Sequence, residues 1–71
     1  TKAARVITAL FEALLDDIRL LPPQFRDAAV RREAARGRRG RARVVADYIA
    51  GMTDRFAIDE HQRLLNPERL T

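Results

Sequence analysis

The chain has 71 residues, enough for one small domain near the size at which a single hydrophobic core supplies only a few kcal/mol of net stability. It contains no cysteine and one histidine, which excludes a disulfide framework and leaves no obvious metal site to compensate for a small core. The formal net charge is +4, but seven arginines lie between positions 31 and 43. The excess positive charge therefore belongs to one segment, and anionic partners are to be sought there.

Residues 2–20 are predicted to form an amphipathic helix. Four apolar residues recur at steps of four and would share one stripe of that helix: Val6, Leu10, Leu14 and Ile18. Proline has no backbone N–H and disfavours the helical conformation of the residue before it, so Pro22 and Pro23 predict a turn over 21–24.

The segment 24–41 is predicted to contain a short helix, near 24–35, followed by an arginine-rich loop. Gly37 and Gly40 lie within four residues of each other in RGRRGRAR, and two glycines so close disfavour a continuous helix. A guanidinium group pairs with phosphate through two parallel hydrogen bonds. The candidate phosphate-contact residues of this loop are Arg38, Arg39, Arg41 and Arg43. The alternative is a solvated loop without a ligand, which the lack of interleaved aromatic residues favours.

Two further helices are predicted, at 41–52 and 53–66. Their apolar stripe contains Val45, Ile49, Met52 and Phe56. A glycine inside a helix costs about 1 kcal/mol relative to alanine, so Gly51 predicts a break, after which Thr53 would cap the next helix. The sequence Asn66-Pro67 would end it. Together these elements predict an all-α fold, a single small bundle of three to four helices over residues 1–71.

Three polar residues of the last two helices are candidates for nucleotide or subunit-interface contacts: Tyr48, Asp54 and Arg55. Each also has a local structural interpretation. Tyr48 would fill the rim of the core. The Asp54 carboxylate would interact favourably with the positive end of the helix dipole, and Arg55 would pair with Asp59 one turn away. Residue spacing alone leaves both interpretations open.

The motif DYIAGMTDRFAIDEH, preceded by RVVA and followed by RLL, resembles the C-terminal signature of deoxyguanosine triphosphate triphosphohydrolase-like proteins, a branch of the HD-domain phosphohydrolases. Upstream, LFEALLDDIRLLPPQFR resembles the preceding segment of the same family. The two blocks cover roughly three quarters of the chain and leave out mainly the arginine-rich stretch. The resemblance implies a C-terminal helical piece of a larger all-α HD-type enzyme, and a chain that begins at Thr1 fits this expectation.

For the parent enzyme, the resemblance implies hydrolysis of deoxynucleoside triphosphates (dNTPs) with Mg²⁺ or Mn²⁺. The metal-binding histidines and the His-Asp dipeptide would lie in an upstream HD domain of the same polypeptide. We expect no catalytic or metal-binding residue in the present chain, because Asp59, Glu60 and His61 are consecutive and face different directions on a helix. A homo-oligomer without a membrane span, located in the cytoplasm, is expected.

Two other functions remain open at this point. The first is a small basic helical module that binds nucleic acid, in which case binding would weaken as salt is raised. The second is a helical domain that self-associates through an exposed apolar stripe.

Overall fold

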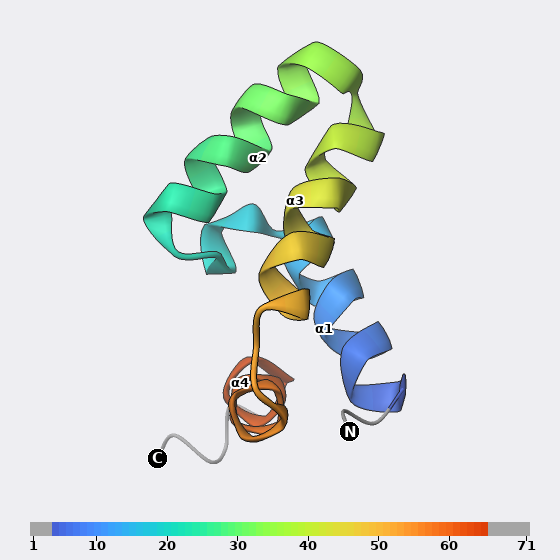
Figure 1. The fold of residues 1–71 in the computed structure, drawn as a ribbon, viewed down its shortest axis with the longest axis vertical. Helices are drawn as coiled ribbons and strands as arrows, with labels where there is room; N and C mark the ends of the chain where they lie inside the picture. The colour runs from blue at the N-terminus through green and yellow to red at the C-terminus, as the bar shows by residue number, and fades with distance from the viewer. Residues whose placement is uncertain (1–3, 66–71) are drawn as a thin grey trace.

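The computed structural model describes residues 4–65, and helices joined by short turns make up that range (Figure 1). Four α-helices follow one another: α1 (Ala4–Asp16), α2 (Pro23–Arg36), α3 (Arg38–Ala50) and α4 (Asp54–Leu65). A short 3-10 helix, η1 (Ile18–Leu20), joins α1 to α2, and no strand is present in the described part of the chain. The predicted all-α class is confirmed.

The core lies where α1 meets α3 and α4. Leu10 and Leu14 of the predicted stripe on α1 are completely buried, as is Val45 of α3. Ile49 and Met52 also belong to the buried cluster, whereas Phe56 is 47% exposed. The apolar periodicity thus identified the inner faces of α1 and α3, but Phe56 lies at the edge because the chain changes direction before α4.

The first helix is shorter than predicted. It ends at Asp16, and the chain continues as η1 instead of as a regular helix to residue 20. The side chain of Asp17 caps η1 by accepting a hydrogen bond from the backbone N–H of Arg19, at 3.1 Å. An acceptor so placed competes with the helical backbone bonding pattern, which explains the early end. The predicted start at residue 2 lies outside the described residues.

The predicted loop in the arginine-rich segment is wrong. Only Gly37 interrupts the helices, with φ 70° and ψ −157°, and α3 begins directly after it at Arg38. Gly40 is buried inside the first turns of α3. A Cβ atom at this position would overlap the carbonyl oxygen of Arg32 and lie 2.7 Å from its carbonyl carbon. Gly40 therefore allows close contact between the α2 and α3 backbones, and this packing outweighs its low helix propensity.

The predicted break between the last two helices is confirmed. The α3 helix ends at Ala50, and α4 begins at Asp54. Thr53 Oγ1 accepts a hydrogen bond from the backbone N–H of Phe56 at 3.1 Å, as expected for an N-cap threonine. The observed α4 ends at Leu65, and the predicted helix end at Asn66-Pro67 lies outside the described residues.

Candidate functional site

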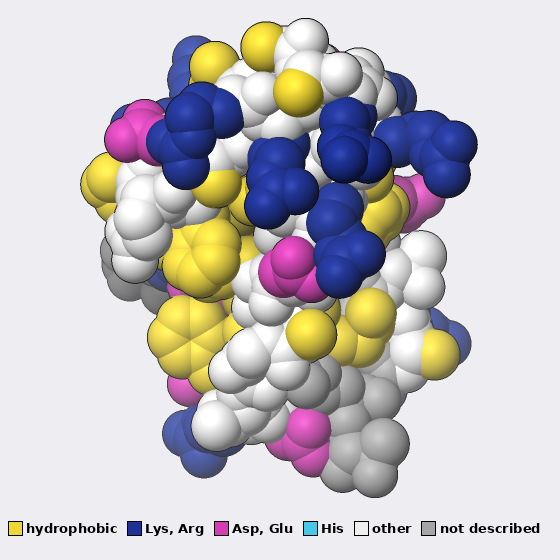
Figure 2. All heavy atoms as spheres, turned by 45° about the horizontal axis from the view of Figure 1, so that its top comes forward, with side chains coloured by type: hydrophobic (Ala, Val, Ile, Leu, Met, Phe, Trp, Pro, Cys, Tyr) yellow, Lys and Arg dark blue, Asp and Glu magenta, His cyan; other side chains and the backbone are white. Residues whose placement is uncertain are grey.

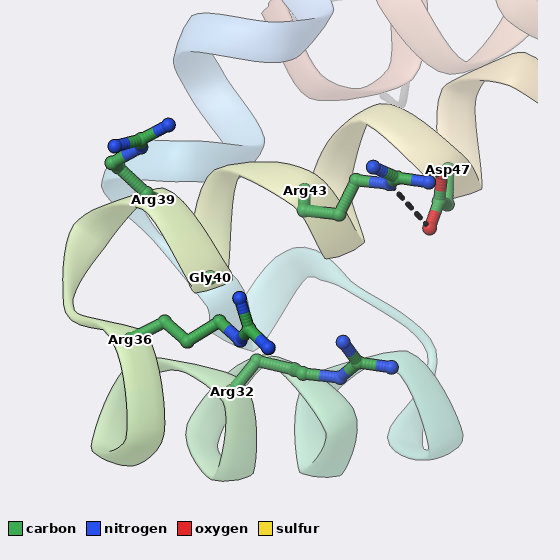
Figure 3. Close-up of a pocket in the computed structure, with 6 residues that line it drawn as sticks. All are labelled: Arg32, Arg36, Arg39, Gly40, Arg43 and Asp47. Carbon is green, nitrogen blue, oxygen red and sulfur yellow. Dashed lines mark hydrogen bonds and ion pairs between the residues drawn. The ribbon is translucent and has the colours of Figure 1, made fainter.

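The hollow with the highest density of charge lies between α2 and α3. It has a volume of about 510 Å³ and is lined by Arg32, Arg36, Arg39, Gly40, Arg43 and Asp47, which we call the arginine hollow. Figure 3 shows Arg32 and Arg36 extending from α2 below Gly40, while Arg43 extends from α3 toward Asp47. In the space-filling view, basic side chains gather around the α2–α3 end of the molecule (Figure 2). The hollow is open to solvent, since all four of its arginines are exposed.

Arg41 does not belong to this hollow. Its side chain is only 17% exposed and lies 3.3 Å from Glu33 Oε1 on α2. Its Nη2 atom donates a hydrogen bond to the carbonyl oxygen of Leu15 at the end of α1. Arg41 thus joins three helices, and the structure places it in packing contacts rather than at a phosphate-accessible surface.

The other predicted phosphate-contact residues separate into two groups. Arg38 lies 3.6 Å from Asp16, on the α1 side and outside the hollow. Arg39 and Arg43 line the hollow, and Arg43 also pairs with Asp47 at 3.2 Å. Arg32 and Arg36 were not among the predicted phosphate-contact residues: Arg32 fell in the predicted short helix, and Arg36 was the first residue of the predicted loop. Their spacing of four residues, repeated by Arg39 and Arg43, was the available signal.

Tyr48 lies half-buried against Phe25, with ring centroids 4.8 Å apart and a tilt of 48°. Both rings line a second hollow of about 350 Å³, the tyrosine hollow, together with Asp47, Gly51, Met52, Thr53 and Phe56. Burial raises the pKa of the Tyr48 phenol, and the Glu60 carboxylate raises it further. A neutral phenol at the rim of the core fits the structural interpretation of Tyr48. One edge of the Tyr48 ring is also accessible from the tyrosine hollow.

Arg55 and Asp54 occupy the first turn of α4. Arg55 is 85% exposed at its side chain and pairs with Asp59 at 3.3 Å, as its spacing predicted. Arg63, one turn after Asp59, does not pair with it, because its guanidinium forms two hydrogen bonds with the nearly buried Glu60, at 2.7 and 2.8 Å. This pairing raises the pKa of Arg63. The structure brings neither Asp54 nor Arg55 into the arginine hollow.

Among residues 4–65, no group of three His, Cys, Asp or Glu side chains is arranged to hold a metal ion. The acidic members of the Asp59-Glu60-His61 run pair separately, Asp59 with Arg55 and Glu60 with Arg63. No helix in this range has the length and apolar character needed to cross a membrane.

A third hollow, of about 390 Å³, lies between α1 and α3 and is lined mainly by apolar side chains: Ile7, Thr8, Phe11, Ala46, Ile49 and Ala50. Several large apolar residues are also exposed on the described surface, namely Val30, Phe56, Ile58 and Leu65. These surfaces are available for packing against another protein element.

The geometry defines a small helical domain with an arginine hollow at one end and apolar hollows beside its core. A family model described as the phosphohydrolase-associated domain matches residues 1–63, and the chain belongs to this family. Similar proteins are named deoxyguanosinetriphosphate triphosphohydrolase-like protein. They include one from Bordetella pertussis (53% identity over 90% of the chain), one from Paracoccus denitrificans (52% over 90%) and one from Thiobacillus denitrificans (47% over 99%).

The chain spans only 15% to 16% of the length of these relatives. No solved structure matches it. The comparisons therefore establish the resemblance expected from the DYIAGMTDRFAIDEH motif, and they do so across the arginine-rich segment as well.

Proposed function

We propose that this chain is the C-terminal helical domain of a metal-dependent dNTP triphosphohydrolase and that it supports catalysis without performing it. The observation that carries the proposal is the 53% identity to a deoxyguanosinetriphosphate triphosphohydrolase-like protein of which the chain spans 15%. In the whole enzyme, Mg²⁺ or Mn²⁺ would be held by residues of an upstream HD domain in the same polypeptide. The enzyme would act in the cytoplasm as a homo-oligomer.

Within that enzyme, we assign to the tyrosine hollow and the start of α4 a contact with bound dNTP or with a neighbouring subunit. Tyr48 offers a neutral phenol at the edge of the hollow, and Thr53 and Phe56 line the same space. Asp54 and Arg55 lie on the adjoining first turn of α4. The apolar hollow between α1 and α3 is a suitable surface for packing against the HD domain, because its lining is mostly aliphatic and aromatic.

The role of Arg55 is testable with a matched control. Arg19 has the same 85% exposure and also forms a local pair with an aspartate, in its case Asp17. In the full-length enzyme, Arg55→Ala should raise the KM for dNTP or shift the oligomer to a smaller species, whereas Arg19→Ala should do neither. Equal behaviour of the two variants would remove Arg55 from the assigned contact.

The proposal that this chain supports catalysis without performing it is tested by assaying the 71-residue chain and the full-length protein side by side. Each would be incubated with every dNTP and with Mg²⁺ or Mn²⁺, and tripolyphosphate release would be measured. We expect release only from the full-length protein. Release by the chain alone would disprove its supporting role, and lack of release by the full-length protein would disprove the enzyme assignment.

A further inference from the structure

We propose that the arginine hollow is a binding site for a compact oligophosphate anion, such as inorganic tripolyphosphate or the triphosphate group of a nucleotide. The site is formed by Arg32 and Arg36 of α2 and by Arg39 and Arg43 of α3 (Figure 3). It differs from the tyrosine hollow assigned above, and its existence does not depend on the hydrolase activity of the parent enzyme.

Without a ligand, the arrangement of the four arginines is electrostatically unfavourable. Arg32 and Arg36 are four residues apart on one helix, and Arg39 and Arg43 are four apart on the next. Like charges at this spacing destabilise a helix. Both pairs line the same hollow, although Figure 3 shows the Arg39 side chain directed away from the other three, and positive charge from both helices adds repulsion there. A bound phosphate group would place negative charge among the guanidinium groups, and its attraction to them would offset their mutual repulsion.

Most guanidinium groups of the hollow are available to a ligand. Within residues 4–65, the side chains of Arg32, Arg36 and Arg39 form no ion pair or hydrogen bond with another described residue. Arg43 pairs with Asp47, the one carboxylate that lines the hollow, at 3.2 Å. Four arginines and a single carboxylate therefore line the hollow, and that carboxylate is already paired.

Gly40 lines the hollow together with the two arginine pairs. Gly40 has no side chain, and the α2 backbone approaches it so closely that a Cβ atom would overlap Arg32. The same glycine that allows the helices to touch thus brings the two arginine pairs to one place. Partly buried Arg41 then fixes α3 to both α2 and α1, which holds the hollow in shape.

The composition of the lining favours a compact anion over a nucleic-acid strand. Guanidinium groups form paired, charge-assisted hydrogen bonds with phosphate oxygens. Sequence-tolerant binding of single strands also uses aromatic rings on which bases stack, and no aromatic residue lines this hollow. The nearby rings of Phe25 and Tyr48 line the tyrosine hollow instead. A ligand recognised only through its phosphates fits these residues best.

The test is a binding titration of the 71-residue chain by calorimetry at low salt, with four probes: tripolyphosphate, dGTP, dTTP and deoxyguanosine. The first three should bind with similar affinity, and deoxyguanosine should not bind. The double variant Arg32→Gln, Arg36→Gln should weaken tripolyphosphate binding by roughly tenfold or more, because it removes two charge-assisted contacts. The single variants should each have part of this effect.

The matched control is Arg31→Gln, which removes an exposed charge from the same helix but lies outside the hollow. It should bind tripolyphosphate nearly as well as the unmodified chain. Circular dichroism and urea unfolding of every variant would verify that a lost signal does not come from lost structure. Because binding is measured without turnover, failure here is distinguishable from failure of the proposed hydrolase function.

Three results would overturn the proposal. The first is equal loss of affinity in Arg31→Gln and in the single variant Arg32→Gln, which would indicate diffuse charge attraction. The second is affinity that depends on the base, or binding of deoxyguanosine. The third is tighter binding of a single-stranded oligonucleotide than of tripolyphosphate at the same salt concentration, which would indicate an extended nucleic-acid surface.

Discussion

Gly40, in the first turns of α3, and Gly51, at its C-terminal end, have opposite roles. A Cβ at Gly40 would collide with the Arg32 backbone, which cannot move without separating α2 from α3. A Cβ at Gly51 would meet only ordinary contacts, 3.7 and 3.8 Å from two carbonyl oxygens, and its φ of −82° suits any residue. The positions therefore form a natural pair for substitution.

We expect Gly40→Ala to lower the free energy of unfolding by about 1–3 kcal/mol through overpacking. Gly51→Ala should leave it unchanged or raise it by about 0.5 kcal/mol, because alanine restricts the unfolded chain. Urea unfolding monitored by circular dichroism measures both. A Gly40→Ala variant as stable as Gly51→Ala would show that the close contact between the helices is absent in solution.

Tyr48 gives the fold a pH dependence in the alkaline range. Burial, aided by Glu60, raises its pKa above the ordinary value of 10.0. Below that value the phenol is protonated in both states, so its contribution to stability is constant. Above it the unfolded chain loses the proton first, so the free energy of unfolding falls as pH rises toward the folded pKa.

Tyr48 is the only tyrosine, so tyrosinate absorbance reports this group alone. The midpoint of its titration should lie at higher pH in the folded chain than in chain unfolded by urea. Tyr48→Phe should remove this part of the alkaline loss of stability. Identical midpoints in the two states would show that the phenol is not buried.

At the scale of helices, the sequence predicted what depends on local pattern. The stripe through Leu10 and Leu14 identified the buried face of α1, and Thr53 marked the start of α4. Prediction from the sequence failed where a contact between residues on different helices determines the local structure. Gly40 is helical because of Arg32 on another helix, and the arginine hollow exists because α2 folds back along α3 (Figure 1). Helix propensity is a property of each residue alone, so it cannot indicate which residue of another helix a glycine will contact.

Arg41 connects α1, α2 and α3, so its replacement should weaken the packing of all three helices. Arg41→Gln removes the hydrogen bonds to the Leu15 carbonyl and to Glu33. We expect the free energy of unfolding to fall by about 1–3 kcal/mol, because partly buried acceptors lose their donor. Arg39→Gln, an exposed substitution of the same chemistry, should change it by less than about 0.5 kcal/mol. Thermal unfolding of the two variants tests this prediction. Equal unfolding midpoints would contradict the role of Arg41 in connecting the helices.

At the scale of the whole molecule, the described surface leaves apolar area uncovered. Ile58 and Leu65 are 43% and 44% exposed and lie seven residues apart, so they share one side of α4. The arginine hollow is lined by residues of α2 and α3, and the α2–α3 turn lies at the end of the molecule away from α4 (Figure 1), so like charges there would oppose contact with a symmetry-related copy. We therefore predict that the 71-residue chain forms a symmetric dimer through apolar residues of its first and last helices.

Sedimentation over a range of protein and salt concentrations tests this prediction. The variant Ile58→Ser, Leu65→Ser should shift the equilibrium toward monomer, because each change removes apolar area from the contact. The control is Val30→Ser on α2, since Val30 is 55% exposed but belongs to the arginine-rich end. An apolar contact should persist or strengthen as salt rises, because salt screens only charge interactions. A monomer at every accessible concentration would refute dimerisation, and dissociation on adding salt would assign the contact to charge pairing instead.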